Sequence, residues 1–167
     1  TTPEARRVLE ALSGDTERLL ETFNGLLQLA QLEGDELRRS MQAVDVAAVV
    51  REVAELYAPL AEEAGRALRC SFEPGLEIRA DRELLAQAIV NLIDNALKYG
   101  TGDGIDVSAR RIGDGVEIDV ADHGPGIPEP ERERVLGRLV RLEASRAIPG
   151  TGLGLSITEA YLRSHDG

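Results

Sequence analysis

QAIVNLIDNALKYG, residues 87–100, is the stretch that decides how the rest of the chain is interpreted. Its apolar residues recur three and four positions apart, the period of a helix with one face in a core: Ile89, Leu92, Ile93, Ala96 and Leu97. Asn91, Asn95 and Lys98 share this spacing, so a helix projects all three from one side. Because asparagine is a poor helix former, two on one stripe cost stability. The stripe therefore predicts a binding surface; the alternative is that these amides bridge neighbouring backbone.

The composition is typical of a globular domain with one core. The chain has 167 residues, of which 43% are hydrophobic, and its net charge of −11 opposes binding to nucleic acid. It contains no run of about 18 apolar residues and no charged-then-apolar leader, so we expect no membrane segment and a cytoplasmic location, with any anchor elsewhere in the parent protein. The single cysteine, Cys70, excludes an internal disulfide and is interpreted as strand packing.

A long N-terminal helix is predicted from Pro3 to about Gly34. Thr2 is suited to the N-cap, and proline is favoured at the first helical position. A heptad seam follows: Leu9, Leu12, Thr16, Leu19, Phe23, Leu26 and Ala30. A lone helix cannot bury this seam, so we expect a partner helix and a homodimer built on a four-helix bundle. The alternative is a break at Gly14, because glycine inside a helix costs about 1 kcal/mol relative to alanine.

Helices and strands are mixed in the remainder of the chain. The expected elements are a strand over 41–44, a helix from Val46 to about Ala64 capped by Asp45 and closed by Gly65, strands over 68–72 and 76–79 around Pro74-Gly75, the central helix capped by Asp81, a hairpin of strands over 105–112 and 116–121, a short helix from Pro130 to about Leu142, and a last helix from Ser156 to about Ser164. This mixture predicts an α+β fold, one sheet with helices packed on one face.

Two glycine-rich boxes accompany the asparagine stripe. Residues 122–127, Asp-His-Gly-Pro-Gly-Ile, end an apolar strand, where a carboxylate can accept from an exocyclic amine and glycines keep the backbone close to a flat ring. Residues 150–155, Gly-Thr-Gly-Leu-Gly-Leu, precede a helix whose first amides suit a phosphate. The first box is also ordinary turn chemistry, and the second is not a P-loop because no Gly-Lys-Ser/Thr follows.

Taken in this order, the three boxes resemble the nucleotide-binding domain of sensor histidine kinases, which shares its ATP fold with DNA gyrase B. The resemblance covers nearly the whole chain and implies the Bergerat (GHKL) fold, a two-layer α/β sandwich with a mixed sheet. Residues 1–39 look like the second helix of the dimerisation and phosphotransfer hairpin, and residues 40–167 like an ATP-binding catalytic domain that is truncated at its C-terminus. Residues 131–146 occupy the place of the ATP lid; Leu136 and Leu139 stand where the family usually has Phe, and we expect a docked lid helix.

The resemblance implies roles at the base and at a metal. Asp122 would accept a hydrogen bond from the adenine amine. The residues that would wall the base are Gly124, Gly126 and Ile127. Asn95 would supply an amide oxygen to Mg²⁺, with Asn91 as a second ligand, and the metal would bridge the phosphates of ATP.

On the phosphate side, the resemblance implies that Lys98 and Tyr99 face the phosphates and the ribose. Arg141, in the lid, would stabilise charge on the γ-phosphoryl as it transfers, with Arg138 and Arg146 as weaker candidates. The loop expected to close on the phosphates consists of Gly150, Thr151, Gly152, Leu153, Gly154 and Leu155. Asn95, Lys98 and Arg141 form the expected catalytic set.

The phosphoacceptor is expected outside this chain. Related ATPases that hydrolyse ATP carry a water-activating Glu where this chain has Asn91, and an amide cannot take a proton. Neither His123 nor His165 lies in the acceptor motif of the family. The resemblance thus implies transfer to a histidine on a phosphoacceptor helix and relay to a response regulator receiver domain. The alternatives are a nucleotide-binding pseudokinase or docking module, and an anti-sigma-factor serine kinase, which the N-terminal seam disfavours.

Overall fold

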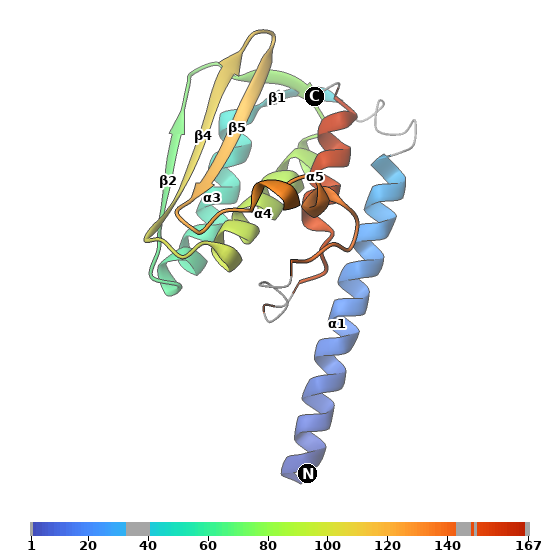
Figure 1. Cartoon of the computed structure of the whole chain (residues 1–167). Coiled ribbons are helices and arrows are strands. Elements are labelled where there is room, and N and C mark those ends of the chain that lie inside the picture. Colours follow the sequence, from blue (N-terminus) through green and yellow to red (C-terminus); the bar gives the residue numbers. More distant parts are fainter. Residues whose placement is uncertain (1, 33–40, 143–147, 149, 166–167) are drawn as a thin grey trace.

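The computed structural model describes residues 2–32, 41–142, 148 and 150–165 (Figure 1). The elements, in chain order, are α1 (Pro3–Leu32), β1 (Gln42–Asp45), α3 (Val46–Glu63), β2 (Ala67–Phe72), β3 (Glu77–Ala80), α4 (Arg82–Tyr99), β4 (Gly104–Ile112), β5 (Gly115–Asp122), the 3₁₀ turns η1 (Glu129–Glu131) and η2 (Arg134–Leu136), and α5 (Gly154–Arg163). The predicted α+β class is confirmed. The junction between residues 39 and 40, and Arg146, lie outside the described residues.

The strands of the described residues form two sheets instead of the single sheet expected. In the larger one, β4 lies between β2, to which it is parallel, and β5, to which it is antiparallel. Strands β1 and β3 pair with each other, antiparallel. Pro74-Gly75 therefore joins strands of different sheets and does not form a hairpin. After this turn, the carbonyl of buried Leu76 accepts a hydrogen bond from the amide of Val46, which places β3 beside the start of α3. The hairpin between β4 and β5 is confirmed.

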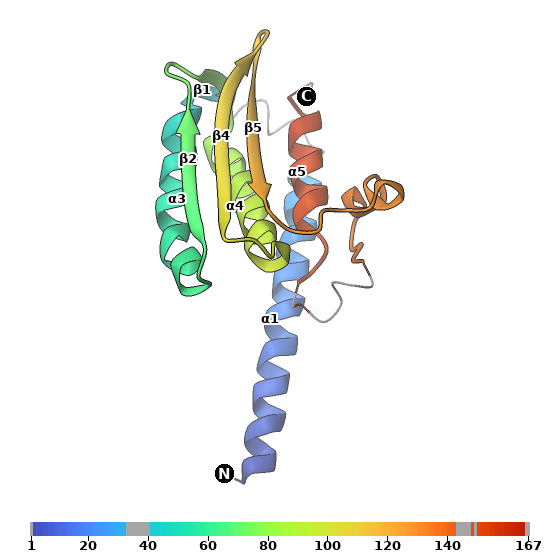
Figure 2. The ribbon, with the colours of Figure 1, turned by 60° about the vertical axis from the view of Figure 1, so that its left-hand side comes forward.

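Helices α3 and α4 cover one face of the larger sheet, and α5 packs beside α4 (Figures 1 and 2). The apolar face of α4 lies in the core, where Ile93 is fully buried. Alternate residues of β4 meet it from the sheet, among them Ile105 and Val107. The core thus fixes which side of α4 remains available for a ligand.

Local signals in the sequence set the ends of both helices. Asp45 accepts a hydrogen bond from the amide of Ala48 at 3.2 Å, and Asp81 accepts one from the amide of Leu84 at 3.0 Å. Side chains of this kind satisfy amides that have no partner within the helix. Gly65, with a φ of +70°, follows the end of α3 in the left-handed conformation. All three predictions are confirmed.

Helix α1 is continuous through Gly14, so the alternative of a break there is wrong. Its C-terminal turns pack on α5, where Leu29 is 2% exposed and a Cβ on Gly25 would lie 2.8 Å from Cδ1 of Leu153. The N-terminal part extends away from the body (Figures 1 and 2). The large side chains of the seam stay exposed: Leu9, Leu12, Leu19, Phe23 and Leu26. No helix of the described ranges is long and apolar enough to cross a membrane.

The expected lid helix from Pro130 to Leu142 is wrong. This segment forms only the 3₁₀ turns η1 and η2, held by bonds of the i to i−3 type such as Leu136 to Glu133. Gly137 then adopts an extended conformation and Leu139 a φ of +60°, both incompatible with continuing a helix.

Cys70 lies in strand β2, as expected, but the residue is exposed rather than packed in the core. Cys70 shares the face of β2 with Leu68 and Phe72, but β2 lies at an edge of its sheet. Partial burial raises the pKa of the Cys70 thiol, and nearby Arg51 opposes this shift.

Candidate functional site

A cavity of about 880 Å³ brings the three boxes together. It lies between α4, the end of β5, the segment that follows η2 and the start of α5. The predicted site residues that line it are Asn91, Asn95, Lys98, Tyr99, Asp122, Gly126, Ile127, Arg141, Gly150, Thr151, Gly152, Leu153, Gly154 and Leu155. Gly124 is not in the lining. A second hollow, of about 480 Å³, lies at the connection between α3 and β2 and contains none of the three boxes.

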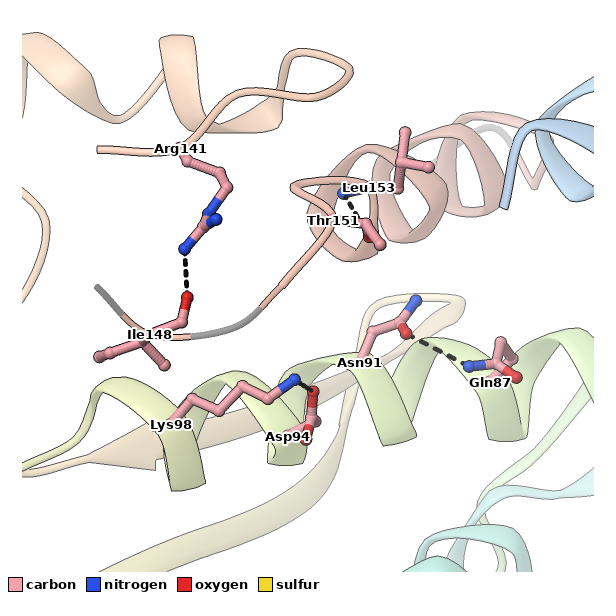
Figure 3. A network of polar contacts seen from close by, with 8 residues as sticks. All are labelled: Gln87, Asn91, Asp94, Lys98, Arg141, Ile148, Thr151 and Leu153. Atoms are coloured by element: carbon pink, nitrogen blue, oxygen red, sulfur yellow. Dashed lines mark hydrogen bonds and ion pairs between the residues drawn. The ribbon is translucent and has the colours of Figure 1, made fainter. Parts of the chain in front are cut away.

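Asn91 links α4 to the start of α5. Its Nδ2 donates a hydrogen bond of 3.1 Å to the carbonyl of Gly154. Its Oδ1 accepts one of 3.2 Å from Nε2 of Gln87, as Figure 3 shows. The bridging alternative drawn from the sequence therefore describes Asn91. Both polar atoms of this amide are engaged by protein.

Asn95 lies one turn further along the same side of α4 and is half-buried in the cavity lining. Within the part of the chain that the structure describes, no hydrogen bond engages its amide. The same residues contain no cluster of three His, Cys, Asp or Glu side chains suited to a metal. A magnesium ion here would depend on the Asn95 oxygen and on oxygens of the nucleotide. This donor set fits Mg²⁺, which usually takes one or two protein ligands together with phosphates and water.

Lys98 and Tyr99 end α4 at the cavity. Nζ of Lys98 pairs with Oδ2 of Asp94 at 2.6 Å along the helix surface, with both side chains more than one third exposed (Figure 3). Both residues of this ion pair line the cavity, so the ammonium lies at the cavity wall with a carboxylate beside it. Tyr99 approaches the second box, since a Cβ on Gly150 would lie 3.5 Å from its hydroxyl oxygen.

Asp122 shapes the first glycine box at the end of β5. Its Oδ1 accepts a hydrogen bond of 2.7 Å from the amide of Gly124, and Oδ2 has no hydrogen-bond partner among the residues that the structure describes. Gly124 packs behind the cavity wall, where a Cβ would lie 3.0 Å from Cα of Gly100. Gly126 has a φ of +70°, which favours glycine. One carboxylate oxygen therefore fixes the turn while the other can accept from a ligand.

The second glycine box forms the wall opposite α4. Gly152 has a φ of +71°, and a Cβ there would lie 2.7 Å from the carbonyl oxygen of Val140. Leu153, at the start of α5, is 1% exposed and anchors the loop in the core. The first amides of α5 have no partner within the helix and carry its positive dipole end, so this side of the cavity favours an anion.

The lid segment contributes Arg141, as expected, but other apolar residues than the two expected anchors. Arg141 lines the cavity, and its guanidinium donates to the carbonyl of Ile148 across the segment (Figure 3). Leu139, one of the two expected anchors, is 55% exposed. Val135 and Val140 line the cavity instead. Arg138 is exposed and outside the lining.

Several residues of the lining were not singled out from the sequence. They are Glu21, Asn24, Gly25 and Gln28 of α1, Tyr57 of α3, and Gln87, Val90 and Asp94 of α4. Gln87 had a detectable signal, because it precedes Asn91 by one helical turn. Burial raises the pKa of the Tyr57 hydroxyl, and the Asp94 carboxylate adds to this shift. The contribution of α1 had no signal, since its seam predicted only a partner helix.

Comparison with known proteins relates this site to a family. Residues 80–167, more than half of the chain, match the family described as histidine kinase-, DNA gyrase B- and HSP90-like ATPase. The sensor-like histidine kinase SenX3 of Mycolicibacterium smegmatis is 34% identical over 97% of this chain and 43% of its own length. The sensor protein IrlS of Burkholderia pseudomallei is 34% identical over all of this chain and 36% of its own length.

A solved structure resembles nearly the whole fold. Full-length ShkA in complex with AMPPNP superposes with a TM-score of 0.81 at 32% identity, covering 98% of this chain and 34% of that one. The mycobacterial sensor histidine kinase MprB gives a TM-score of 0.66 at 28% identity, covering 75% of this chain and 80% of its own. The chain spans less than half the length of the two curated relatives above.

Proposed function

Because the chain belongs to the family of histidine kinase-, DNA gyrase B- and HSP90-like ATPases, we propose that it binds ATP and passes the γ-phosphoryl to a histidine outside its own sequence. It corresponds to the ATPase catalytic domain of sensor histidine kinases. The observation that carries the proposal is the cavity of about 880 Å³, which three boxes distant in sequence line together. These relatives give no support to the pseudokinase alternative.

The lining supports one orientation of ATP. The adenine lies at the end of β5, where Oδ2 of Asp122 accepts from the exocyclic amine and Gly126 lets the backbone approach the ring. The phosphates lie toward Gly150 and Thr151 and the first amides of α5. Tyr99 lies between these two ends, on the ribose side.

The reaction forms a bond from an imidazole nitrogen to the γ-phosphorus as the bond to the β-phosphate oxygen breaks, and ADP leaves. Lys98 and Arg141 supply positive charge on the cavity wall for the transferring group. When bound, Mg²⁺ supplies further neutralisation of the phosphates, with Asn95 as its protein ligand. The described lining has Asn91 where hydrolysing relatives carry Glu, so it offers no base there to activate water.

Phosphotransfer in trans tests the proposal. The chain is mixed with a separate acceptor hairpin that carries the phosphoacceptor histidine, with Mg²⁺ and γ-labelled ATP. We expect label on the hairpin histidine, its loss in Asn95→Ala, and its retention in Gln42→Ala, which removes an exposed amide on β1. Nucleotide binding without label on the hairpin would contradict the kinase assignment. Release of inorganic phosphate from ATP at the same rate with and without the hairpin would contradict it as well.

The exposed seam of α1 supports a homodimer, with the long helices of two copies in a bundle. A response regulator receiver domain would then take the phosphoryl group, and this part of the protein would work in the cytoplasm. Light scattering tests the dimer: Leu19→Glu, at a side chain that is 70% exposed, should lower the average mass without altering the fold. An equal average mass for the original chain and Leu19→Glu, at every concentration, would show that the seam of α1 does not form a dimer.

A further inference from the structure

Arg66 occupies a position behind the nucleotide cavity that no sequence box marks. It follows Gly65 in the connection from α3 to β2, and its amide donates to the carbonyl of Ala61 at 2.8 Å. This turn lies at the same end of the molecule as the C-terminus of α4 (Figures 1 and 2). The side chain is half-buried and reaches from α3 to α4.

The guanidinium of Arg66 holds the last carbonyls of α4. Nη1 donates to the carbonyl of Ala96 at 2.7 Å and to that of Leu97 at 3.0 Å, and Nη2 donates to the carbonyl of Gly100. The last carbonyls of a helix have no partner within it and form its negative dipole end. The carbonyl of Ala96 also accepts from the amide of Gly100 at 3.0 Å, so Arg66 adds a second donor there. The same planar cation holds the carbonyls of Leu97 and Gly100.

Gly100, one of the three residues whose carbonyls Arg66 holds, lies against the first glycine box. A Cβ on Gly100 would lie 3.0 Å from Cβ of Asp122 and 3.1 Å from Nη1 of Arg66. A Cβ on Gly124 would lie 3.0 Å from Cα of Gly100. The turn that presents Asp122 therefore packs on the backbone of Gly100, whose carbonyl Arg66 holds. Its other contacts are with β4, where Ile105 pairs with Asp122 and Asp106 contacts His123.

We propose that Arg66 is a positioning residue for the base end of the nucleotide site. It acts through Gly100, by holding the C-terminus of α4 where the turn over residues 122–124 packs on it. The proposal rests on the nucleotide site proposed above. It assigns no contact with the nucleotide to Arg66, which is absent from the cavity lining. The phosphate end, built on the start of α5, does not depend on this contact.

Binding measurements on the 167-residue chain separate the two ends of the site. We measure the Kd of adenosine, which has only the base end, and of ADP, for the original chain, Arg66→Gln and Arg66→Lys. Arg66→Gln should weaken both ligands by the same factor, about tenfold, the effect of losing a charge-assisted contact that orders a site. The Kd values of Arg66→Lys should lie between those of the original chain and of Arg66→Gln, since an ammonium can hold only some of the three carbonyls.

Arg111→Gln is the matched control, because the guanidinium of Arg111 also donates to a backbone carbonyl, that of Gly75, at 2.9 Å. This bond lies at the far end of β4 from Gly104, and its loss should leave both Kd values unchanged. Each Kd refers to folded protein, with melting curves fixing the folded fraction. Unchanged adenosine binding by folded Arg66→Gln would overturn the positioning role, and if that variant does not fold, unchanged binding by Arg66→Lys would do so.

The result also distinguishes this proposal from the proposed function. If the original chain binds neither ligand, the nucleotide site itself is wrong. If the original chain binds both and the Arg66 variants bind equally well, only the positioning role is wrong. A loss confined to ADP would place the effect at the phosphate end and would likewise overturn it.

Discussion

Nδ2 of Asn91 donates a hydrogen bond of 3.1 Å to the carbonyl of Gly154, 63 positions further along the chain. The same carbonyl accepts from Oγ1 of Thr158 at 3.0 Å, and Oδ1 of Asn91 is held by Gln87. One half-buried amide thus joins the central helix to the first turn of α5. This contact sets the distance between the asparagine stripe and the loop expected to bind phosphate.

Asn91→Ala should destabilise the fold and weaken ADP binding together. Replacement leaves the carbonyl of Gly154 with one partner fewer and removes the contact that holds the start of α5. Loss of a half-buried hydrogen bond should lower the free energy of unfolding by about 1 to 2 kcal/mol. Urea denaturation gives the free energy of unfolding, and calorimetry gives the affinity. Gln87→Ala is the control, because it keeps the bond from Asn91 to Gly154; an equal loss of ADP affinity in both variants would contradict this account.

Gly152→Ala should impair the loop at residues 150–153. The left-handed conformation costs an L residue about 1 to 2 kcal/mol, and the added Cβ would lie 2.7 Å from the carbonyl of Val140 and 2.9 Å from the carbonyl carbon of Leu139. We expect a lower free energy of unfolding. The affinity for ADP should fall more than the affinity for adenosine, because this loop lies at the phosphate end. Equal weakening of both ligands would show that the loop does not act on the phosphates.

Gly14→Ala should stabilise α1. Gly14 lies inside the helix, and nothing lies within 4 Å of a Cβ built there. Alanine is better than glycine in a helix interior by about 1 kcal/mol. Circular dichroism at rising temperature should show later melting of the helical signal, with adenosine affinity unchanged. Earlier melting would mean that the helix bends at Gly14 in solution.

Asp122→Asn should weaken adenosine binding about tenfold, or about 1.4 kcal/mol, with little change in stability. An asparagine Oδ1 can still accept from the amide of Gly124, but its amide group opposes the exocyclic amine of adenine. Asp119→Asn, at an exposed carboxylate on the same strand, is the control and should change neither quantity. If Asp122→Asn keeps the full affinity for adenosine, the adenine does not bind at Asp122.

The pKa of Asp106 should depend on His123. Nε2 of His123 lies 3.1 Å from Oδ2 of Asp106, and Nε of Arg69 donates to Oδ1 at 2.9 Å; these contacts hold the pKa of Asp106 below its ordinary value. A lowered pKa in the folded state means that the stabilisation is present above the ordinary carboxyl pKa and is lost as the pH falls through the lowered value.

His123→Ala should therefore raise the pKa of Asp106 toward its ordinary value, which a carbon-detected NMR titration of the carboxyl group measures. His165→Ala removes a ring that contacts Tyr161 at the end of α5 and should leave the titration unchanged. An Asp106 titration that is identical in His123→Ala and the original chain would show that the contact is absent in solution.

The helix boundaries were predictable because they depend on neighbours in sequence. Asp45 and Asp81 cap the helices that follow them, and Gly65 ends α3. The lid shows where local pattern fails. Residues 131–142 have helical spacing, yet Gly137 and Leu139 adopt backbone conformations that end a helix. The segment lines the cavity, and Arg141 within it donates to the carbonyl of Ile148.

The sequence by itself determined the apolar period of α4, the order of the three boxes and the family they indicate, because each is written in spacings of a few residues. Only the tertiary structure decided what each polar group does. It engaged Asn91 with Gly154 and left the amide of Asn95 facing the cavity, although both share one stripe. It also brought α1 to the site and Arg66 behind it. The reason is physical: hydrogen bonds and packing between distant segments depend on how the core orients its helices, and that orientation is a property of the whole fold.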